Sequence, residues 1–231
     1  MKNAYEKAAY LFEQADDDEY SAFCKEKAAL LAKHVPSPNG SKQAAGLMGL
    51  YGLGDCNLLN KDVIAPGGAH GYSTFLGWAT LAVKAMANDM PGALEDMKAY
   101  WGKMLELGAT TFWEDFNLDW TENAYGIDEL VPEGGNDIHA HHGAYCYKGL
   151  RHSLCHAWAS GPAPFLIEYV LGIKPLDPGC SVCTITPDLG DLEWAEGSFP
   201  TPYGKISVRH ERTPEGDINT VVSAPPQITI V

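Results

Sequence analysis

Apolar side chains recur at helical spacing through the first part of the chain. Residues 4–15 place them three and four positions apart, and a second segment rich in Ala, Lys and Glu continues to about His34, so two helices are predicted. The run 36–41 contains two prolines and an Asn-Gly pair, which predict a loop. The short segment 43–53 is rich in Ala, Gly and Leu, and its small side chains allow close packing against a neighbour.

Two stronger apolar stripes follow along the chain. The apolar residues of 72–86 fit the i, i+3, i+4, i+7 spacing of one helix face. Asp89 and Pro91 then supply a polar cap and a first-turn proline for a second stripe over 94–105. Gly108 is suited to end that helix. Two further helices are therefore predicted.

The last predicted helix covers about 152–171 and ends at Gly172. Pro162 and Pro164 lie inside this segment, and proline removes a backbone donor and clashes with the preceding turn. We therefore expect two helical pieces or a kink.

The pattern changes to short β-prone runs in the last quarter of the chain. Residues 205–222 alternate around the turn 213–217 and predict a β-hairpin, and 228–231 predict another strand. The fold class is thus mainly α with a β appendage, divided into a helical domain over 1–178 and a small antiparallel β domain over 179–231.

The chain carries 16 basic and 30 acidic residues in 231, a formal net charge of −14. This charge argues against nucleic acid or an anionic membrane as a partner. No apolar run approaches the length of a membrane span. The amino terminus contains acidic residues and no long apolar core, so it does not read as a signal peptide. As it stands, the chain is expected to be soluble and cytoplasmic.

The cysteine and histidine patterns do not predict a cofactor or a metal site. Cys180 and Cys183 have the spacing of half a zinc site or of a redox pair, but no second such pair follows, and free thiols are expected. His139, His141 and His142 could ligate a metal, but no partner at a recognised spacing completes the set.

One acidic residue stands in an aromatic setting just beyond a predicted helix end. Phe112, Trp113 and Phe116 flank Glu114, and such surroundings desolvate a carboxylate and suit it to proton transfer. Trp113 would also offer a flat face to a sugar ring. On spacing alone, a buried aromatic corner in which Glu114 caps the next helix is the more common arrangement.

A second candidate pair, His156 and Trp158, stands close together near the start of the last predicted helix. A lone histidine on a helix is more often structural than catalytic. Neither pair identifies a reaction by itself.

Four ordered segments together resemble the end of the bacterial α-L-rhamnosidase family. Gly-Ala-Thr-Thr-Phe-Trp-Glu at 108–114 resembles that family's Trp-Glu segment, and Ser-Leu-Cys-His-Ala-Trp-Ala-Ser-Gly-Pro at 153–162 resembles its Cys-His-Gly-Trp segment. The run 170–175 resembles its Leu-Gly-Ile-x-Pro exit, and the tail 190–204 also matches in order. Residues 1–60 match only loosely.

The resemblance implies a fold, a reaction and roles for the candidate residues. The fold would be part of an (α/α)6 barrel of the six-hairpin glycosidase type, followed by a small β-sandwich. The reaction would be hydrolysis of a terminal α-L-rhamnoside with inversion. Glu114 would be the general base, and Trp113, His156 and Trp158 would contact the carbohydrate substrate, so all four are expected to converge on one pocket.

An inverting glycosidase also needs a general acid. In the family this acid lies in a stretch rich in Asp, Glu and Arg upstream of the Trp-Glu segment, and no such stretch is found here. The dense acidic run 16–19 reads as a solvated helix start. Residues 1–175 also hold about half the helices of a complete barrel, so the chain is expected to be a half barrel without the acid, whether a fragment or a degenerate relative.

A half barrel would leave apolar helix faces open to water. A homodimer would cover them, or residues 119–150 would fold over them. Two other functions stay open. The chain could act on another glycoside, such as an unsaturated uronide, or it could be a non-catalytic carbohydrate-binding or interaction protein.

Overall fold

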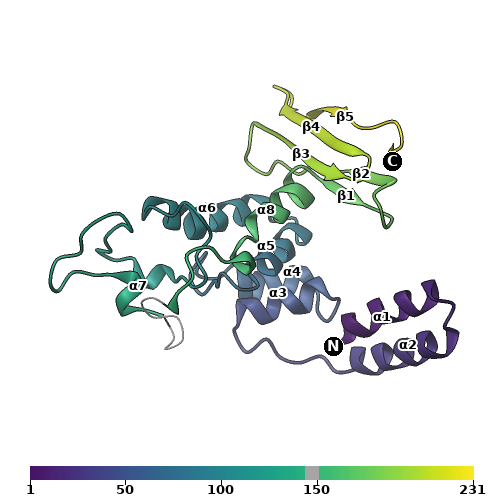
Figure 1. Ribbon diagram of the computed structural model, residues 1–231, viewed down its shortest axis with the longest axis horizontal. Helices are drawn as coiled ribbons and strands as arrows, with labels where there is room; N and C mark the ends of the chain where they lie inside the picture. The colour runs from purple at the N-terminus through teal and green to yellow at the C-terminus, as the bar shows by residue number, and fades with distance from the viewer. Residues whose placement is uncertain (144–150) are drawn as a thin grey trace.

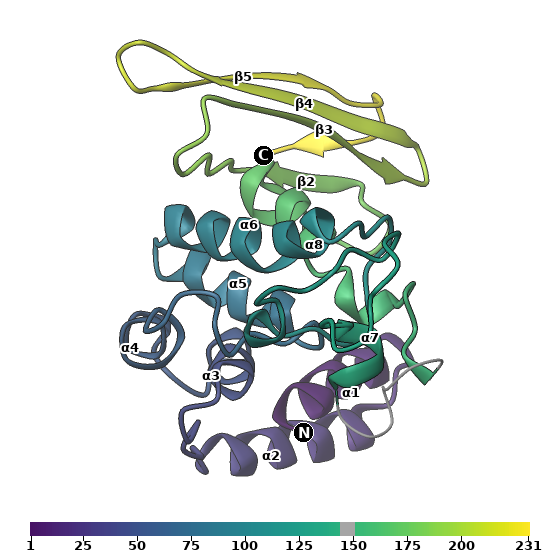
Figure 2. The same ribbon diagram turned by 90° about the vertical axis from the view of Figure 1, so that its left-hand side faces the viewer.

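The computed structural model describes residues 1–143 and 151–231. Helices occupy most of the first 170 residues, and two small sheets follow (Figures 1 and 2). The helices are α1 (Lys2–Gln14), α2 (Asp18–Ala32), α3 (Lys42–Leu50), α4 (Cys56–Leu59), η1 (Asn60–Ile64), α5 (Gly77–Met86), α6 (Met90–Glu106), η2 (Leu118–Trp120), α7 (Ile138–His141), η5 (Ala157–Ala159), α8 (Pro162–Phe165) and η6 (Leu166–Val170). The strands are β1 (Ile173–Pro175), β2 (Val182–Ile185), β3 (Trp194–Thr201), β4 (Gly204–Arg212), β5 (Ile218–Ser223) and β6 (Thr229–Ile230).

The first two helices form a hairpin that projects from the rest of the chain (Figure 1). Asp16 turns the chain in a left-handed conformation, with φ 55°, and the Asp17 side chain caps α2 by accepting from the amide of Tyr20. Phe12 stacks on Tyr20, with 5.3 Å between ring centroids. Both predicted helices are confirmed, and the acidic run 16–19 is the solvent-facing helix start that was expected.

Helices α3, α5 and α6 form the central helical layer. Gly46 of α3 lies against α5 so closely that a Cβ there would be 2.8 Å from the amide nitrogen of Thr80, which confirms the expected close packing of this segment. The Asp89 side chain caps α6 by accepting from Gly92, with Pro91 in its first turn, as predicted. The largest cluster of buried apolar residues spans α5, α6 and the segment after α6.

The helix predicted over 72–86 begins only at Gly77. Leu76 is in the left-handed conformation, with φ 66°, which a continuous right-handed helix cannot contain. The side chains before it form tertiary contacts instead, such as the hydrogen bond from the Tyr72 hydroxyl to Asp96.

The helix predicted over 152–171 is wrong in its first half. Residues 153–156 are not helical because their backbone groups bond to the distant segment 112–114. An α-helix forms only from Pro162, where α8 leads into η6, and it is preceded by the single 3₁₀ turn η5. The expected ending at Gly172 is confirmed by its φ of 67°. The prolines thus mark where the helix starts, since proline is tolerated in a first turn.

The carboxy-terminal part contains two three-stranded sheets. One has the order β3-β4-β5 and is antiparallel throughout, which confirms the predicted hairpin; the other has the order β1-β2-β6, in which β2 and β6 are parallel. Ile173 pairs with Ile185, so β1 joins the sheet from before residue 178, and the predicted division at 178/179 stays a prediction. Cys183 is buried in β2.

Candidate active site

Glu114 lies in the extended segment that follows α6. Gly108, with φ 88°, turns the chain out of the helix, and the hydroxyl of Tyr100 on α6 donates to the carbonyl of Phe116. This bond ties the far end of the segment back onto the helix. Trp113 and Phe116 are buried in the main core on either side of Glu114, which is itself only 9% exposed.

The segment 152–156, which precedes the short helix η5, lies directly beside the Glu114 segment. The amide of Glu114 donates to the carbonyl of Ser153 over 2.9 Å, and the amide of His156 donates to the carbonyl of Phe112 over 2.8 Å. Two segments that are 39 residues apart in sequence are thereby joined through their backbones. This pairing explains why His156 and Trp158 stand next to Glu114.

The carboxylate of Glu114 is held on one side. Its Oε2 accepts from the backbone amide of Ser153 over 2.9 Å. Its Oε1 lies 3.6 Å from Nδ1 of His156, which is longer than a hydrogen bond and makes an ion pair only when the imidazole is protonated. One oxygen is thus oriented by a fixed donor, and the other faces an imidazole that is partly open to solvent.

The backbone carbonyl of Glu114 is fixed as well. It accepts from the indole Nε1 of Trp158 over 3.0 Å and from the hydroxyl of the buried Thr74, which precedes α5. Three separate parts of the chain therefore meet at Glu114. Because both donors lie on the same carbonyl, the carboxylate is carried on a backbone unit that has little freedom to turn.

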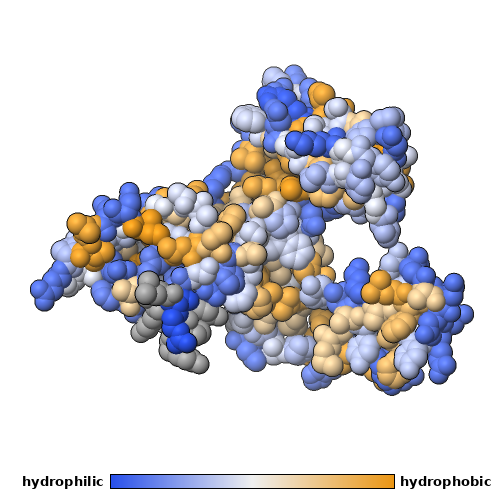
Figure 3. All heavy atoms as spheres, viewed as in Figure 1, coloured by the Kyte–Doolittle hydropathy of each residue, from blue (hydrophilic) through white to orange (hydrophobic). Residues whose placement is uncertain are grey.

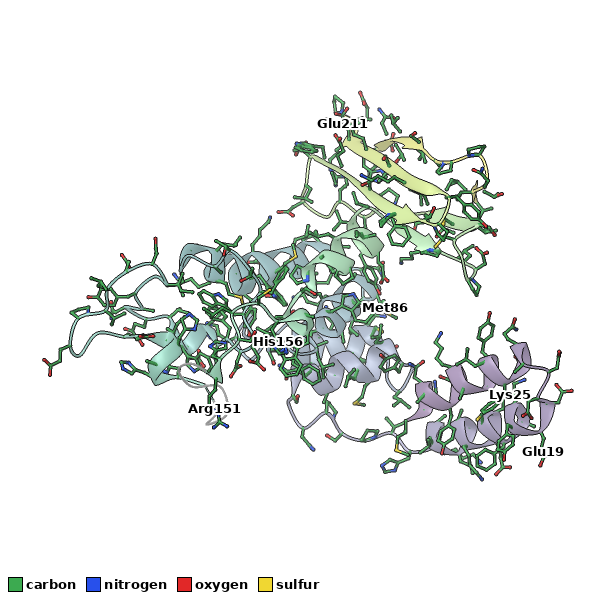
Figure 4. All side chains as sticks on the ribbon, in the orientation of Figure 1. Glu19, Lys25, Met86, Arg151, His156 and Glu211 are labelled. Atoms are coloured by element: carbon green, nitrogen blue, oxygen red, sulfur yellow. The ribbon has the colours of Figure 1, made fainter. Side chains whose placement is uncertain are left out.

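Exposed aromatic rings border this carboxylate. Trp158 is 40% exposed. Its ring centroid lies 4.2 Å from the ring centroid of His156 and 5.1 Å from that of Phe75. Figure 4 places His156 in the middle of the helical part of the molecule. Such a surface suits the apolar face of a sugar ring, with the Glu114 carboxylate beside it.

Of the four predicted site residues, the structure brings three together: Glu114, His156 and Trp158. Trp113 lies elsewhere, because its indole is 1% exposed and packs edge-on against His139 at 4.5 Å. Its predicted contact with a sugar stays a prediction, and this burial does not support it. The expected convergence of all four residues on one pocket stays a prediction.

Sequence reasoning missed the residues that hold Glu114 in place. Thr74 and Ser153 act through a hydroxyl and a backbone amide, neither of which has a sequence signature. His152 was also missed: its Nε2 accepts from the amide of Asp115 over 3.0 Å. Ser153 did stand inside the recognised segment 153–162, so that signal could have drawn attention to its neighbour.

Two histidines lie against the back of the Glu114 segment. The Nδ1 atoms of His139 and His152 are 3.1 Å apart. Burial, with a smaller contribution from the neighbouring His152, lowers the pKa of His139 to about 4. Burial also lowers the pKa of His152, against the opposing effect of nearby acidic groups. Both imidazoles are therefore neutral at neutral pH.

The predicted metal candidates have separate partners. His142 stacks on Trp120 and bonds to the side chain of Asn136, whereas His141 accepts from the amide of Asp137. Within residues 1–143 and 151–231, no group of three or more His, Cys, Asp or Glu side chains could hold a metal ion. Five of the cysteines are free thiols, and Cys146 lies outside the described residues.

An apolar cavity of about 390 Å³ lies apart from Glu114, beside α6. Met97, Trp101, Leu105, Phe112 and Leu166 contribute to its walls. None of the described residues of 119–143 lines it. Ile138 of this segment is buried in the main core, and the expected covering of the open side by residues 119–150 stays a prediction. Residues 144–150 lie outside the described part. Among the helices of the described chain, none combines the length and apolar character needed to cross a membrane.

Comparison with known sequences adds family matches to this geometry. Residues 172–231 match the family described as the bacterial alpha-L-rhamnosidase C-terminal domain. An alpha-L-rhamnosidase of Alteromonas sp. (strain LOR) is 34% identical over 125 residues, which cover 53% of this chain and 11% of that protein. The chain therefore corresponds to a small part of the length of that relative.

Solved structures share the fold of nearly the whole chain. The GH78 family rhamnosidase of Bacillus sp. GL1 matches 99% of this chain and 25% of its own, with a TM-score of 0.74 and 23% identity. The match to the rhamnosidase of Aspergillus terreus covers 100% of this chain and 27% of that one, with a TM-score of 0.76 and 18% identity. The match to the α-L-rhamnosidase of Streptomyces avermitilis, solved in complex with L-rhamnose, covers 99% of this chain and 22% of that one, with a TM-score of 0.74 and 20% identity. At these identities the likeness shows the fold.

Proposed function

We propose that this chain, which matches the carboxy-terminal part of bacterial α-L-rhamnosidases in sequence and in fold, supplies the general base of an inverting glycoside hydrolase. The observation that carries the proposal is the Glu114 carboxylate, which the Ser153 amide orients beside the partly exposed His156 and the exposed Trp158. The proposed substrate is a terminal α-L-rhamnoside.

The proposed step uses the free side of the carboxylate. Oε1 of Glu114 accepts a proton from water as the water oxygen bonds to the anomeric carbon, and the bond from that carbon to the leaving oxygen breaks. The Ser153 amide keeps Oε2 occupied, so the proton goes to Oε1. Attack from the face opposite the leaving group inverts the anomeric centre.

His156 and Trp158 are proposed as substrate contacts. The partly exposed imidazole of His156 can donate to a sugar hydroxyl, and the indole of Trp158 offers a ring face while its Nε1 stays engaged with the Glu114 carbonyl. Trp158 therefore both supports the base and contacts the ring. Trp113, which is buried, would act by packing behind Glu114.

The general acid and the remainder of an (α/α)6 barrel are proposed to come from outside residues 1–231. The dense acidic run at the start of α2 is unsuited to the role, because Glu19 lies far from His156, at the end of the α1–α2 hairpin in Figure 4. The helices of this chain would then form one part of that barrel. Whatever supplies the remainder would bring the acid to the open side of Glu114.

Self-association is proposed as a second way to cover exposed apolar surface. Figure 3 shows such surface over the α1–α2 hairpin, where the exposed apolar side chains are Tyr10, Leu11, Tyr20, Phe23 and Leu30. The cavity beside α6 adds a further apolar wall. Contiguous apolar patches beyond a few hundred Å² are rare on monomers.

A second function is favoured by the same aromatic surface. Phe75, His156 and Trp158 could bind a carbohydrate without turnover, since ring stacking needs no second carboxyl group. Both functions predict that L-rhamnose perturbs the Trp158 indole N–H resonance. Only the first predicts chemistry that depends on Glu114.

Hydrolysis of methyl α-L-rhamnoside, whose alkoxide leaving group needs protonation, tests the proposal when it is measured with the chain and with Glu114→Gln. Because the acid is proposed to be absent, the chain should be slower than a complete enzyme by about 10²–10⁴-fold. Any turnover should fall in Glu114→Gln, while L-rhamnose binding, followed at the Trp158 indole, should persist. Full turnover by the chain alone would contradict the missing acid. A hydrolysis rate that is the same in the chain and in Glu114→Gln would contradict the role of Glu114 as general base.

A further inference from the structure

We propose that His152 and His139 form a positioning pair, in which two neutral imidazoles with fixed tautomers hold the backbone immediately after Glu114. Two hydrogen bonds define the pair. The Asp115 amide donates to Nε2 of His152 over 3.0 Å, and Nδ1 of His152 lies 3.1 Å from Nδ1 of His139. Its effect on catalysis rests on the proposed role of Glu114, but its existence does not.

The hydrogen bonds assign every proton of the pair. An amide N–H only donates, so Nε2 of His152 is the acceptor and carries no proton. A neutral imidazole with a bare Nε2 is protonated at Nδ1, and that N–H then donates to Nδ1 of His139. Nδ1 of His139 is therefore bare, and its proton is on Nε2, which is buried without a hydrogen-bond partner among the described residues.

The pair connects α7 to the Glu114 segment. The side chain of Asp137 caps α7 by accepting from the amides of His139 and Ala140, which fixes the His139 backbone. The His139 ring packs edge-on against Trp113, next to Glu114. His152 is followed by Ser153, whose amide holds the Glu114 carboxylate. Displacing the His152 ring would thus release the amide of Asp115, next to Glu114 in sequence, and would shift the amide of Ser153, which holds the carboxylate.

A proton added to this arrangement breaks it. Protonated His152 has no acceptor for the Asp115 amide, and protonated His139 presents a second donor to Nδ1 of His152. Among residues 1–143 and 151–231, the charged or titratable groups that face the pair are Glu114, Asp115, Asp137 and His156. Burial outweighs these acids and lowers the pKa of both imidazoles, so the neutral pair is complete at neutral pH and is lost as the pH falls.

Long-range ¹H–¹⁵N spectra of the histidine side chains test the assignment directly in the full chain. At pH 7.5 His152 should show the Nδ1–H tautomer and His139 the Nε2–H tautomer. This measurement needs no variant. An Nε2–H tautomer at His152, or a charged imidazole at either position, would overturn the proposal.

Two substitutions of His152 separate the contacts of the ring. Gln places an oxygen where Nε2 was and can still accept from the Asp115 amide, whereas Asn reaches only the Nδ1 position. Amide exchange at Asp115 should therefore speed up by about 10-fold in His152→Asn and change little in His152→Gln, as expected for one hydrogen bond. His34→Gln, at the exposed end of α2, is the matched histidine control.

The pH dependence of the same amide adds a readout that a purely structural role would not move. Protection of Asp115 should be lost on acidification in the native chain and retained in His152→Gln, because glutamine does not titrate. An equal loss of Asp115 protection on acidification in the native chain and in His152→Gln would overturn the proposed pair. If the tautomers are as assigned but hydrolysis does not depend on Glu114, the proposed function alone is contradicted. If hydrolysis depends on Glu114 but the tautomers differ from the assignment, the pair alone is contradicted.

Discussion

Replacing Lys84 by Met should destabilise the protein more than any surface charge change. Lys84 on α5 and Asp96 on α6 are 4% and 5% exposed, and their Nζ and Oδ2 atoms are 2.7 Å apart. Asp89 lies 3.4 Å from the same Nζ, and the Tyr72 hydroxyl donates to Asp96 over 3.1 Å. Met keeps the length of the side chain and removes its charge, which leaves the Asp96 carboxylate buried without its cation.

The size of the effect follows from this burial. Removing one partner of a buried ion pair costs about 3–5 kcal/mol in the free energy of unfolding, which lowers the Tm by about 6–20 °C for a chain of this length. Tyr72 stands two residues before Thr74, whose hydroxyl holds the Glu114 carbonyl. Loosening Asp96 should therefore disturb the site as well as the core.

Thermal and urea unfolding, followed by circular dichroism, measure the effect. The matched control is Lys103→Met on the exposed face of α6, where Lys103 and Glu106 are paired at 2.9 Å and the loss should be about 0–1 kcal/mol. The double variant Lys84→Met/Asp96→Leu should recover most of the loss, since an apolar pair replaces the charged one. A Lys84→Met variant no less stable than Lys103→Met would refute the reasoning.

Three further predictions concern packing, pH and assembly. Gly46→Ala should cost about 1–3 kcal/mol, because its Cβ would lie 2.8 Å from the Thr80 amide nitrogen. Gly102→Ala, also in a helix but with open space around the Cβ, should instead raise the Tm in the same unfolding assay. Stability should be greatest above pH 6.5 and should fall between pH 6.5 and about 4, because the pKa of His139 is lowered on folding; a His139→Asn variant should show a smaller fall when urea unfolding is repeated at each pH. Sedimentation velocity at micromolar concentration should show self-association, whereas a single species of 25.0 kDa would contradict it.

Local signals in the sequence predicted several elements correctly. The amphipathic stripe and caps of α6, the helices α1 and α2, and the β4–β5 hairpin all follow from periodicity and turn residues, which act over a few positions. The start of α5 was predicted too early, because Leu76 adopts a left-handed conformation that only its tertiary setting imposes.

Long-range pairing accounts for the other errors. The segment 153–156 has helix-compatible composition, but its amides and carbonyls bond to 112–114, which no local pattern reveals. Strand β3 was missed because it contains Gly197 and Pro200, residues that usually end strands. A Cβ at Gly197 would lie 2.4 Å from Cδ1 of Leu171, so that side chain would have to move to admit one.

The candidate site was predicted in part for the same reason. The family-like segments identified Glu114, His156 and Trp158, which the structure places together. They also suggested Trp113, which neighbours Glu114 in sequence but points into the core. Adjacent residues of an extended segment face opposite sides, so an aromatic residue next to a carboxylate is expected to face away from it.

The most direct test of the central claim is hydrolysis of α-L-rhamnosyl fluoride by the chain. Fluoride leaves without protonation, so this substrate needs the general base but not the general acid. We predict release of fluoride with β-L-rhamnose as the first product, detected by ¹H NMR, and a rate that falls by about 10²–10⁴-fold in Glu114→Gln. Equal rates for the chain and Glu114→Gln, or α-L-rhamnose as the first product, would contradict the assignment of Glu114 as the base of an inverting reaction.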